Sequence, residues 1–113
     1  MQKVLYHATY APLIYSIKRT GLGGGYRKNW PDSESGVVYL ATDPHVALSY
    51  AETSDDVPEE WLDEIVVLRI LTALIDPAKL SIDPNVRDND GSTLIYRGVI
   101  PLRSIVFWPK VNK

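Results

Sequence analysis

The stretch from Gly36 to Glu52 constrains the fold of this chain more than any other part of the sequence. It opens with the apolar run Val37–Ala41 and continues through the pair Asp43 and Pro44. An aspartate followed by proline is typical of a helix start, because aspartate caps free N–H groups and proline is tolerated at the first helical position. The stretch therefore predicts a strand over 37–41, a tight turn and a helix from Pro44 through about Ala51.

Further elements are expected on both sides of this unit. A first strand is predicted over 4–7, followed by a short helix over 11–19 with proline near its start and glycine after its end. Apolar runs predict strands over 65–71, 93–96 and 104–108, and the segment 74–80 is expected to wrap the sheet edge. Short strands, with helices confined to the first half, predict an α+β fold with a compact mixed or antiparallel sheet.

The chain has 113 residues, the size of a single domain with one modest core, so we expect one domain over 1–113. A net charge of −2 does not suggest the broad basic surface of a duplex-binding protein. The absence of cysteine excludes disulfides and cysteine-ligated metals, and two histidines alone make a poor zinc site. No apolar run has membrane-spanning length, so we expect a cytoplasmic protein without a membrane partner or a metal.

Two segments have both a simple interpretation and a functional alternative. Glu52–Glu64 carries half of the carboxylates and no base, which is typical of a solvated surface but also suits a basic protein partner. The segment 21–35 predicts a long glycine-rich loop that opens no helix, so it is not a phosphate loop. Its alternative role is a cover over a ligand, in which Arg27 or Lys28 meets a pyrophosphate beside aromatic rings.

Candidate site residues gather at two strand-to-helix junctions. His7 ends the predicted first strand beside Tyr6, and Tyr39 and Tyr50 stand eleven residues apart in the strand–turn–helix unit. Aromatic residues at such positions are usually part of the core. A lone histidine is more often structural than functional, but at a strand end beside a loop the two roles are about equally frequent. Two rings that meet across a corner can also hold a planar ring between them. The set suits a flat heterocycle and its sugar, and a nicotinamide nucleotide is the first hypothesis to test.

Three segments taken together resemble the ADP-ribosyltransferase superfamily, the fold of diphtheria-toxin-like transferases and poly-ADP-ribose polymerases. Leu5-Tyr6-His7-Ala8-Thr9 looks like its first strand, and Gly36-Val37-Val38-Tyr39-Leu40-Ala41 with Ala47-Leu48-Ser49-Tyr50-Ala51 is similar to its tyrosine strand and following helix. The run from Thr93 to Ile105, with Ile100-Pro101, looks like a late strand of many bacterial members.

The resemblance implies a protein that binds NAD as its substrate. It implies that His7 holds the adenosine-side ribose and that the backbone after it, at Ala8 and Thr9, bonds the nicotinamide amide. It also implies that Tyr39 and Tyr50 flank the nicotinamide ring. The basic pair that includes Arg27 is the candidate for the pyrophosphate.

The late segment departs from the pattern of the His-Tyr-Glu members, which carry a glutamate at the start of that strand. Counting back from Pro101 places that position on Ser92 or Thr93, and the nearest carboxylate is Asp90. A hydroxyl can bond a ribose but cannot offset the positive charge that develops as a glycosidic bond breaks. NAD recognition is therefore better supported than transfer chemistry.

Three functions stay open at this point. The first is a mono-ADP-ribosyltransferase that modifies a macromolecular acceptor, as small toxins and effectors of this fold commonly do. The second is a catalytically inactive module that binds NAD, ADP-ribose or a protein partner. The third is an enzyme similar to the RNA 2′-phosphotransferases, which use NAD and do not need the glutamate. Their arginine before the histidine is replaced here by Tyr6.

Overall fold

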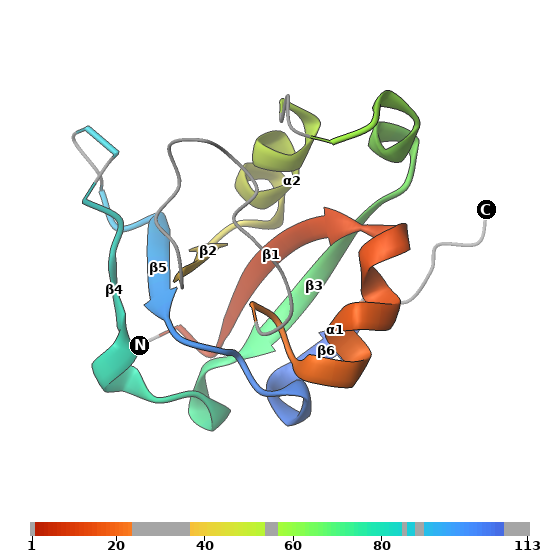
Figure 1. The fold of residues 1–113 in the computed structure, drawn as a ribbon. Helices are drawn as coiled ribbons and strands as arrows, with labels where there is room; N and C mark the ends of the chain where they lie inside the picture. Colours follow the sequence, from red (N-terminus) through yellow and green to blue (C-terminus); the bar gives the residue numbers. More distant parts are fainter. Residues whose placement is uncertain (1, 24–36, 54–56, 85, 88–89, 108–113) are drawn as a thin grey trace.

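The computed structural model describes residues 2–23, 37–53, 57–84, 86–87 and 90–107. Within these residues, strands form one antiparallel sheet in the order β4-β5-β2-β1-β3-β6 (Figure 1). The strands are β1 (Val4–Tyr10), β2 (Val37–Ala41), β3 (Ile65–Leu71), β4 (Leu80–Ile82), β5 (Thr93–Arg97) and β6 (Ile105–Phe107). Together with two short helices, this sheet confirms the predicted α+β class and is antiparallel throughout.

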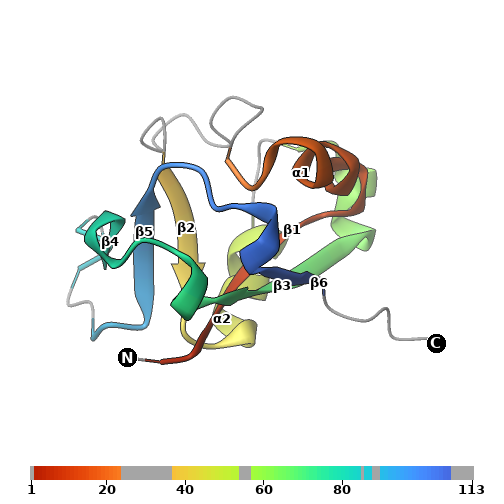
Figure 2. The ribbon, with the colours of Figure 1, turned by 90° about the horizontal axis from the view of Figure 1, so that it is seen from below.

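Two α-helices pack on different sides of β1 and β3 (Figures 1 and 2). They are α1 (Ile14–Thr20) and α2 (Pro44–Glu52). The start of α2 is as predicted, since the Asp43 carboxylate accepts a hydrogen bond from the backbone N–H of His45 at 2.7 Å. Single 3₁₀ turns complete the described elements: η1 (Ala11–Leu13), η2 (Glu59–Asp63), η3 (Thr72–Leu74), η4 (Pro77–Lys79) and η5 (Leu102–Ser104).

The main core lies between the sheet and the elements around α1. Ile17 of α1 and Leu22 just after it are fully buried against strand residues such as Leu68 and Ile70. Burying such side chains removes apolar surface from water and is the main favourable term in folding. The complete cluster of buried residues is Leu5, Ile17, Leu22, Val38, Leu40, Leu68, Ile70, Ile75, Tyr96, Ile100 and Ile105.

The pairing between β1 and β2 divides the sheet into two halves. Along β1 and β3 the ladder is continuous from Val4↔Leu71 to Tyr10↔Ile65, and that of β2 and β5 is also complete. The described register of β1 and β2, in contrast, holds the single pair Tyr6↔Ala41, which we name the central joint. Figure 2 shows β2 and β5 running in a clearly different direction from β1 and β3. On either side of the joint, side chains of β1 and of the residues before it bond to the other half: Gln2 donates to the carbonyl of Thr42, and His7 bonds to the carbonyl of Tyr39.

Several predicted boundaries were wrong by a few residues. The first strand continues to Tyr10, and the expected helix over 11–19 begins with the 3₁₀ turn Ala11–Leu13, where Pro12 lacks an N–H and no side chain caps the start. The segment 74–80 does lead to the sheet edge, but β4 follows it there as an unpredicted strand of three residues. The last strand starts one residue late because Ser104 belongs to η5, and position 108 lies outside the described residues.

The predicted loop after α1 begins with an ordered contact. Leu22 and Ile100 exchange two backbone hydrogen bonds of 3.0 Å. To reach this contact, Gly21 adopts a φ of 82°, and a Cβ atom there would lie 2.8 Å from the carbonyl oxygen of Ile100. Glycine is therefore required at this position for both conformation and space.

Replacing Gly21 by alanine should lower the free energy of unfolding by about 1–3 kcal/mol, because the left-handed backbone and the contact with Ile100 both oppose a Cβ atom. Urea denaturation measures this loss. Gly91→Ala is the matched control, since Gly91 also has a positive φ but no atom within 4 Å of the added Cβ. An equal loss in both variants would contradict the role of the Ile100 contact.

Candidate functional site

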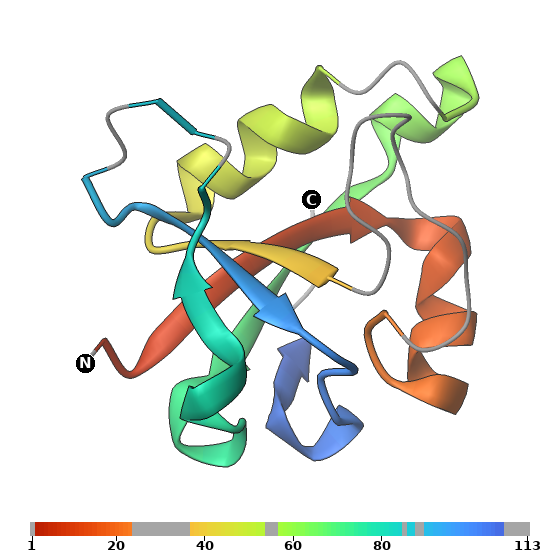
Figure 3. The same cartoon turned by 60° about the vertical axis from the view of Figure 1, so that its left-hand side comes forward.

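A pocket lies beside the central joint, between β1, β2 and α2. Figure 3 shows α2 running along one side of these two strands. The free space within the pocket is narrow, with room for about one water molecule in this conformation. Its lining residues are four tyrosines, one histidine and small or apolar residues, with no charged side chain among them: Tyr6, His7, Ala8, Thr9, Tyr10, Tyr39, Leu40, Ala41, Ala47, Tyr50 and Ala51.

His7 connects the two halves of the sheet next to the joint. Its Nδ1 lies 2.8 Å from the carbonyl oxygen of Tyr39. Because a carbonyl can only accept, this contact assigns the proton to Nδ1 and leaves Nε2 as an acceptor in the neutral ring. Burial lowers the pKa of His7 below its ordinary value, and the hydrogen bond to Tyr39 opposes this only in part. His7 is therefore a neutral imidazole at pH 7 that can accept a hydrogen bond from a ligand hydroxyl.

The lowered pKa of His7 makes the stability of the fold sensitive to mild acid. Since its ordinary value is 6.5, the unfolded chain binds a proton on this residue at a higher pH than the folded chain does. The contribution is present above pH 6.5 and is lost as the pH falls below it, by at most about 1.4 kcal/mol per pH unit. In urea denaturation, His7→Gln should reduce this loss, whereas His45→Gln, at an exposed position, should keep it. The same loss in both variants would contradict the assignment.

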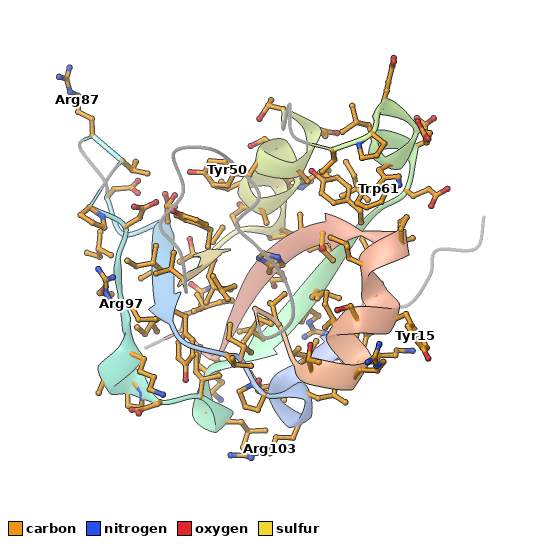
Figure 4. The ribbon with its side chains drawn as sticks, viewed as in Figure 1. Tyr15, Tyr50, Trp61, Arg87, Arg97 and Arg103 are labelled. Atoms are coloured by element: carbon orange, nitrogen blue, oxygen red, sulfur yellow. The ribbon has the colours of Figure 1, made fainter. Side chains whose placement is uncertain are left out.

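Tyr39 and Tyr50 reach the pocket from β2 and α2, so the structure brings both predicted tyrosines to the same pocket as His7. Figure 4 shows Tyr50 projecting from α2 toward β5. There its hydroxyl lies 3.2 Å from the Oγ1 atom of Thr93. Thr93 is buried and pairs with Ala41, which lines the pocket.

The predicted backbone contacts, Ala8 and Thr9, are lining residues as well.

Ser92 and Asp90 are hydrogen-bonded to each other in the turn before β5. The backbone N–H of Ser92 donates to the Asp90 carboxylate at 3.0 Å, and the Ser92 carbonyl accepts from the N–H of Thr42 at 3.0 Å. Hydrogen bonds from the side chain and backbone of Ser92 lower the pKa of Asp90. Neither residue is among the described residues that line the pocket, and Thr93 is adjacent to the pocket through Tyr50 and Ala41.

Tyr6 and Tyr10 are pocket residues that the sequence analysis did not select. The Tyr10 hydroxyl donates to the carbonyl of Ala51 at 2.8 Å, which ties β1 to the end of α2. Its ring also contacts Trp61 of η2, with the ring centroids 5.9 Å apart. The alternation of Tyr6, Ala8 and Tyr10 at a period of two was the available signal, because alternate residues of a strand share one face.

Comparisons with known proteins give no further identification. No family model and no curated protein sequence matches the chain. In the parts of the chain that the structure describes, no helix has both the length and the hydropathy needed to cross a membrane. Within the same ranges, no three potential metal-ligating side chains lie together. The geometry of the pocket is therefore the basis for any functional proposal.

Two further predictions concern segments that the structure describes only in part. Arg27 and Lys28, the candidates for a pyrophosphate, lie outside the described residues. In the acidic segment 52–64, the carboxylates of Glu59, Glu60 and Asp63 are exposed on η2. Exposure of this kind fits a solvated surface, and a basic protein partner for it stays a prediction.

Proposed function

We propose that this chain is an ADP-ribosyltransferase-like protein whose pocket binds NAD and that it transfers ADP-ribose to a macromolecular acceptor. The observation that supports the proposal most is the meeting of His7, Tyr39 and Tyr50 at one pocket. These residues come from three separate elements and are the same ones that the resemblance assigns to NAD.

The chemistry of the lining fits the nicotinamide end of NAD. Tyrosine faces carry negative electrostatic potential, and a flat cationic ring such as nicotinamide is attracted to them. The neutral His7 ring offers Nε2 as an acceptor for a ribose hydroxyl, with its orientation fixed by the Tyr39 carbonyl. Ala8 and Thr9, whose backbone the resemblance assigns to the nicotinamide amide, line the same pocket.

A second candidate, recognition of NAD or ADP-ribose without turnover, is favoured by one observation. Among the described residues no carboxylate lines the pocket, and the carboxylate nearest in sequence to the expected glutamate position, Asp90, is hydrogen-bonded to Ser92. Without a negative group, the site lacks a means to offset the charge that develops when the nicotinamide bond breaks. The third possibility, an RNA 2′-phosphotransferase, is less favoured because Tyr6 stands where that group has an arginine.

Calorimetric titration of NAD and ADP-ribose, followed by a nicotinamide-release assay on the same sample, tests the proposal. Binding with slow nicotinamide release would support the transferase, and binding without release would support the recognition module. Failure of both ligands to bind would contradict both candidates. Tyr15→Ala is a suitable control variant, because Tyr15 is 73% exposed on α1 and does not line the pocket.

A further inference from the structure

We infer that Thr93 is a positioning residue for this pocket: its hydroxyl holds the Tyr50 ring in place, and a planar ligand enters when that hydrogen bond opens. The identity of the ligand rests on the proposed function. The hydrogen bond is a property of the chain itself and can be tested without any ligand.

Tyr50 is the lining residue whose side chain we infer to rotate when a ligand enters. With 36% of its surface exposed, it is the most exposed of the described residues that line the pocket. It lies on the last turns of α2, and its hydroxyl reaches across to β5, 43 residues further along the chain. An exposed phenol is ordinarily satisfied by water, so this bond to Thr93 fixes a ring that would otherwise sample several rotamers.

Thr93 is the fixed partner in this contact. Only 3% of its surface is exposed, and its backbone is held in the ladder between β5 and β2 opposite Ala41. Ala41 in turn forms the central joint with Tyr6. Because threonine is β-branched, few χ1 rotamers are open to it, so its Oγ1 atom has a defined position. A rigid hydroxyl at the joint can therefore set where the Tyr50 ring lies.

Ser92 does not share this role, although the sequence left Ser92 and Thr93 as equal candidates. The backbone and side chain of Ser92 are engaged with Asp90, and its carbonyl is bonded to Thr42. Ser92→Ala is consequently the matched control for Thr93.

A planar ring needs more room than the pocket offers in this conformation, which is enough for about one water molecule. The other walls cannot easily supply this room, since Tyr39 lies in the β2–β5 ladder and Ala47 and Ala51 are buried residues of α2. Outward rotation of Tyr50 opens the space, and its hydrogen bond to Thr93 is then broken. The bond therefore competes with the ligand.

Nitration of tyrosines by tetranitromethane, quantified by mass spectrometry, tests the inference without a ligand. In Thr93→Val, which keeps the side-chain shape and removes the hydroxyl, nitration of Tyr50 should become about two- to tenfold faster, the effect of losing one ordinary hydrogen bond. Thr93→Ser, which keeps the hydroxyl but not the β-branch, should give a rate between those of the parent protein and Thr93→Val, and Ser92→Ala should match the parent protein. Tyr15, which is 73% exposed, serves as the internal reference in every sample. An unchanged rate at Tyr50 in Thr93→Val would overturn the inference.

NAD titration of the same variants separates this inference from the proposed function. Affinity should rise about two- to tenfold in Thr93→Val and also in Tyr50→Phe, which removes the other hydroxyl of the pair and covers the case in which Thr93→Val does not fold. A fall in affinity in Thr93→Val would show that Thr93 contacts the ligand directly and would overturn its role as a positioning residue. Faster nitration in a protein that binds no NAD would support the positioning role and contradict the proposed function.

Discussion

Replacing His7 by alanine should lower the affinity for NAD by about ten- to a hundredfold, as measured by calorimetric titration. The substitution removes the Nε2 acceptor from the pocket and also breaks the contact between Nδ1 and the Tyr39 carbonyl at 2.8 Å. Loss of one hydrogen bond to a ligand accounts for about a tenfold change, and loss of the contact with Tyr39 across the two halves of the sheet adds to it.

His45→Ala is the control for this prediction. His45 is exposed in the first turn of α2 and does not line the pocket, so its affinity for NAD should equal that of the parent protein. Thermal denaturation of both variants verifies that the fold persists. An affinity that is unchanged in a folded His7→Ala protein would remove His7 from the site and would weaken the proposed function as a whole.

Replacing Leu68 by alanine should lower the free energy of unfolding by about 2–5 kcal/mol, the range for a fully buried leucine that leaves a cavity. Leu68 has no exposed surface and lies in β3 between its partners His7 on β1 and Phe107 on β6. Its loss therefore affects the packing beneath three strands. Because such a loss is a large part of the stability of a small domain, the variant should also unfold at much lower urea concentration.

Leu74→Ala is the matched control, since it removes the same atoms from a side chain that is 40% exposed on η3. It should cost well under half as much as Leu68→Ala, because water already covers part of its surface and no enclosed cavity forms. Comparable losses in the two variants would contradict the buried position of Leu68.

The parts of the fold that the sequence predicted well are those with strong local signals. The strand Val37–Ala41 and the start of α2 follow from an apolar run and from the capping pair of Asp43 and Pro44, whose effects act within a few residues. The strand Leu80–Ile82 was missed because three residues are too short for a periodic pattern, and its pairing with β5 is a tertiary contact.

Some residues of the candidate site were predictable from the sequence, but the contacts between them were not. His7, Tyr39 and Tyr50 were selected from their places at strand ends and in the helix, and the structure places them at one pocket. The bond between Tyr50 and Thr93 joins α2 to β5 through the register of the sheet, which no local pattern encodes. The choice between Ser92 and Thr93 depended on where β5 begins and on its register, which places Thr93 opposite Ala41 and leaves Ser92 in the turn before the strand.

The division of the sheet at the central joint also bears on how the chain is assembled during synthesis. Each half joins an early strand to late ones: β1 pairs with β3, which pairs with β6, and β2 pairs with β5. The β1–β3 and β2–β5 ladders connect residues more than fifty positions apart. Pairing over such distances carries a large loop-closure cost and makes folding slow for a domain of this size. A chain emerging from the ribosome exposes the apolar strand Val37–Ala41 until β5 follows it, so the half of the sheet that carries Tyr39 is not complete before residues 93–97 have been made.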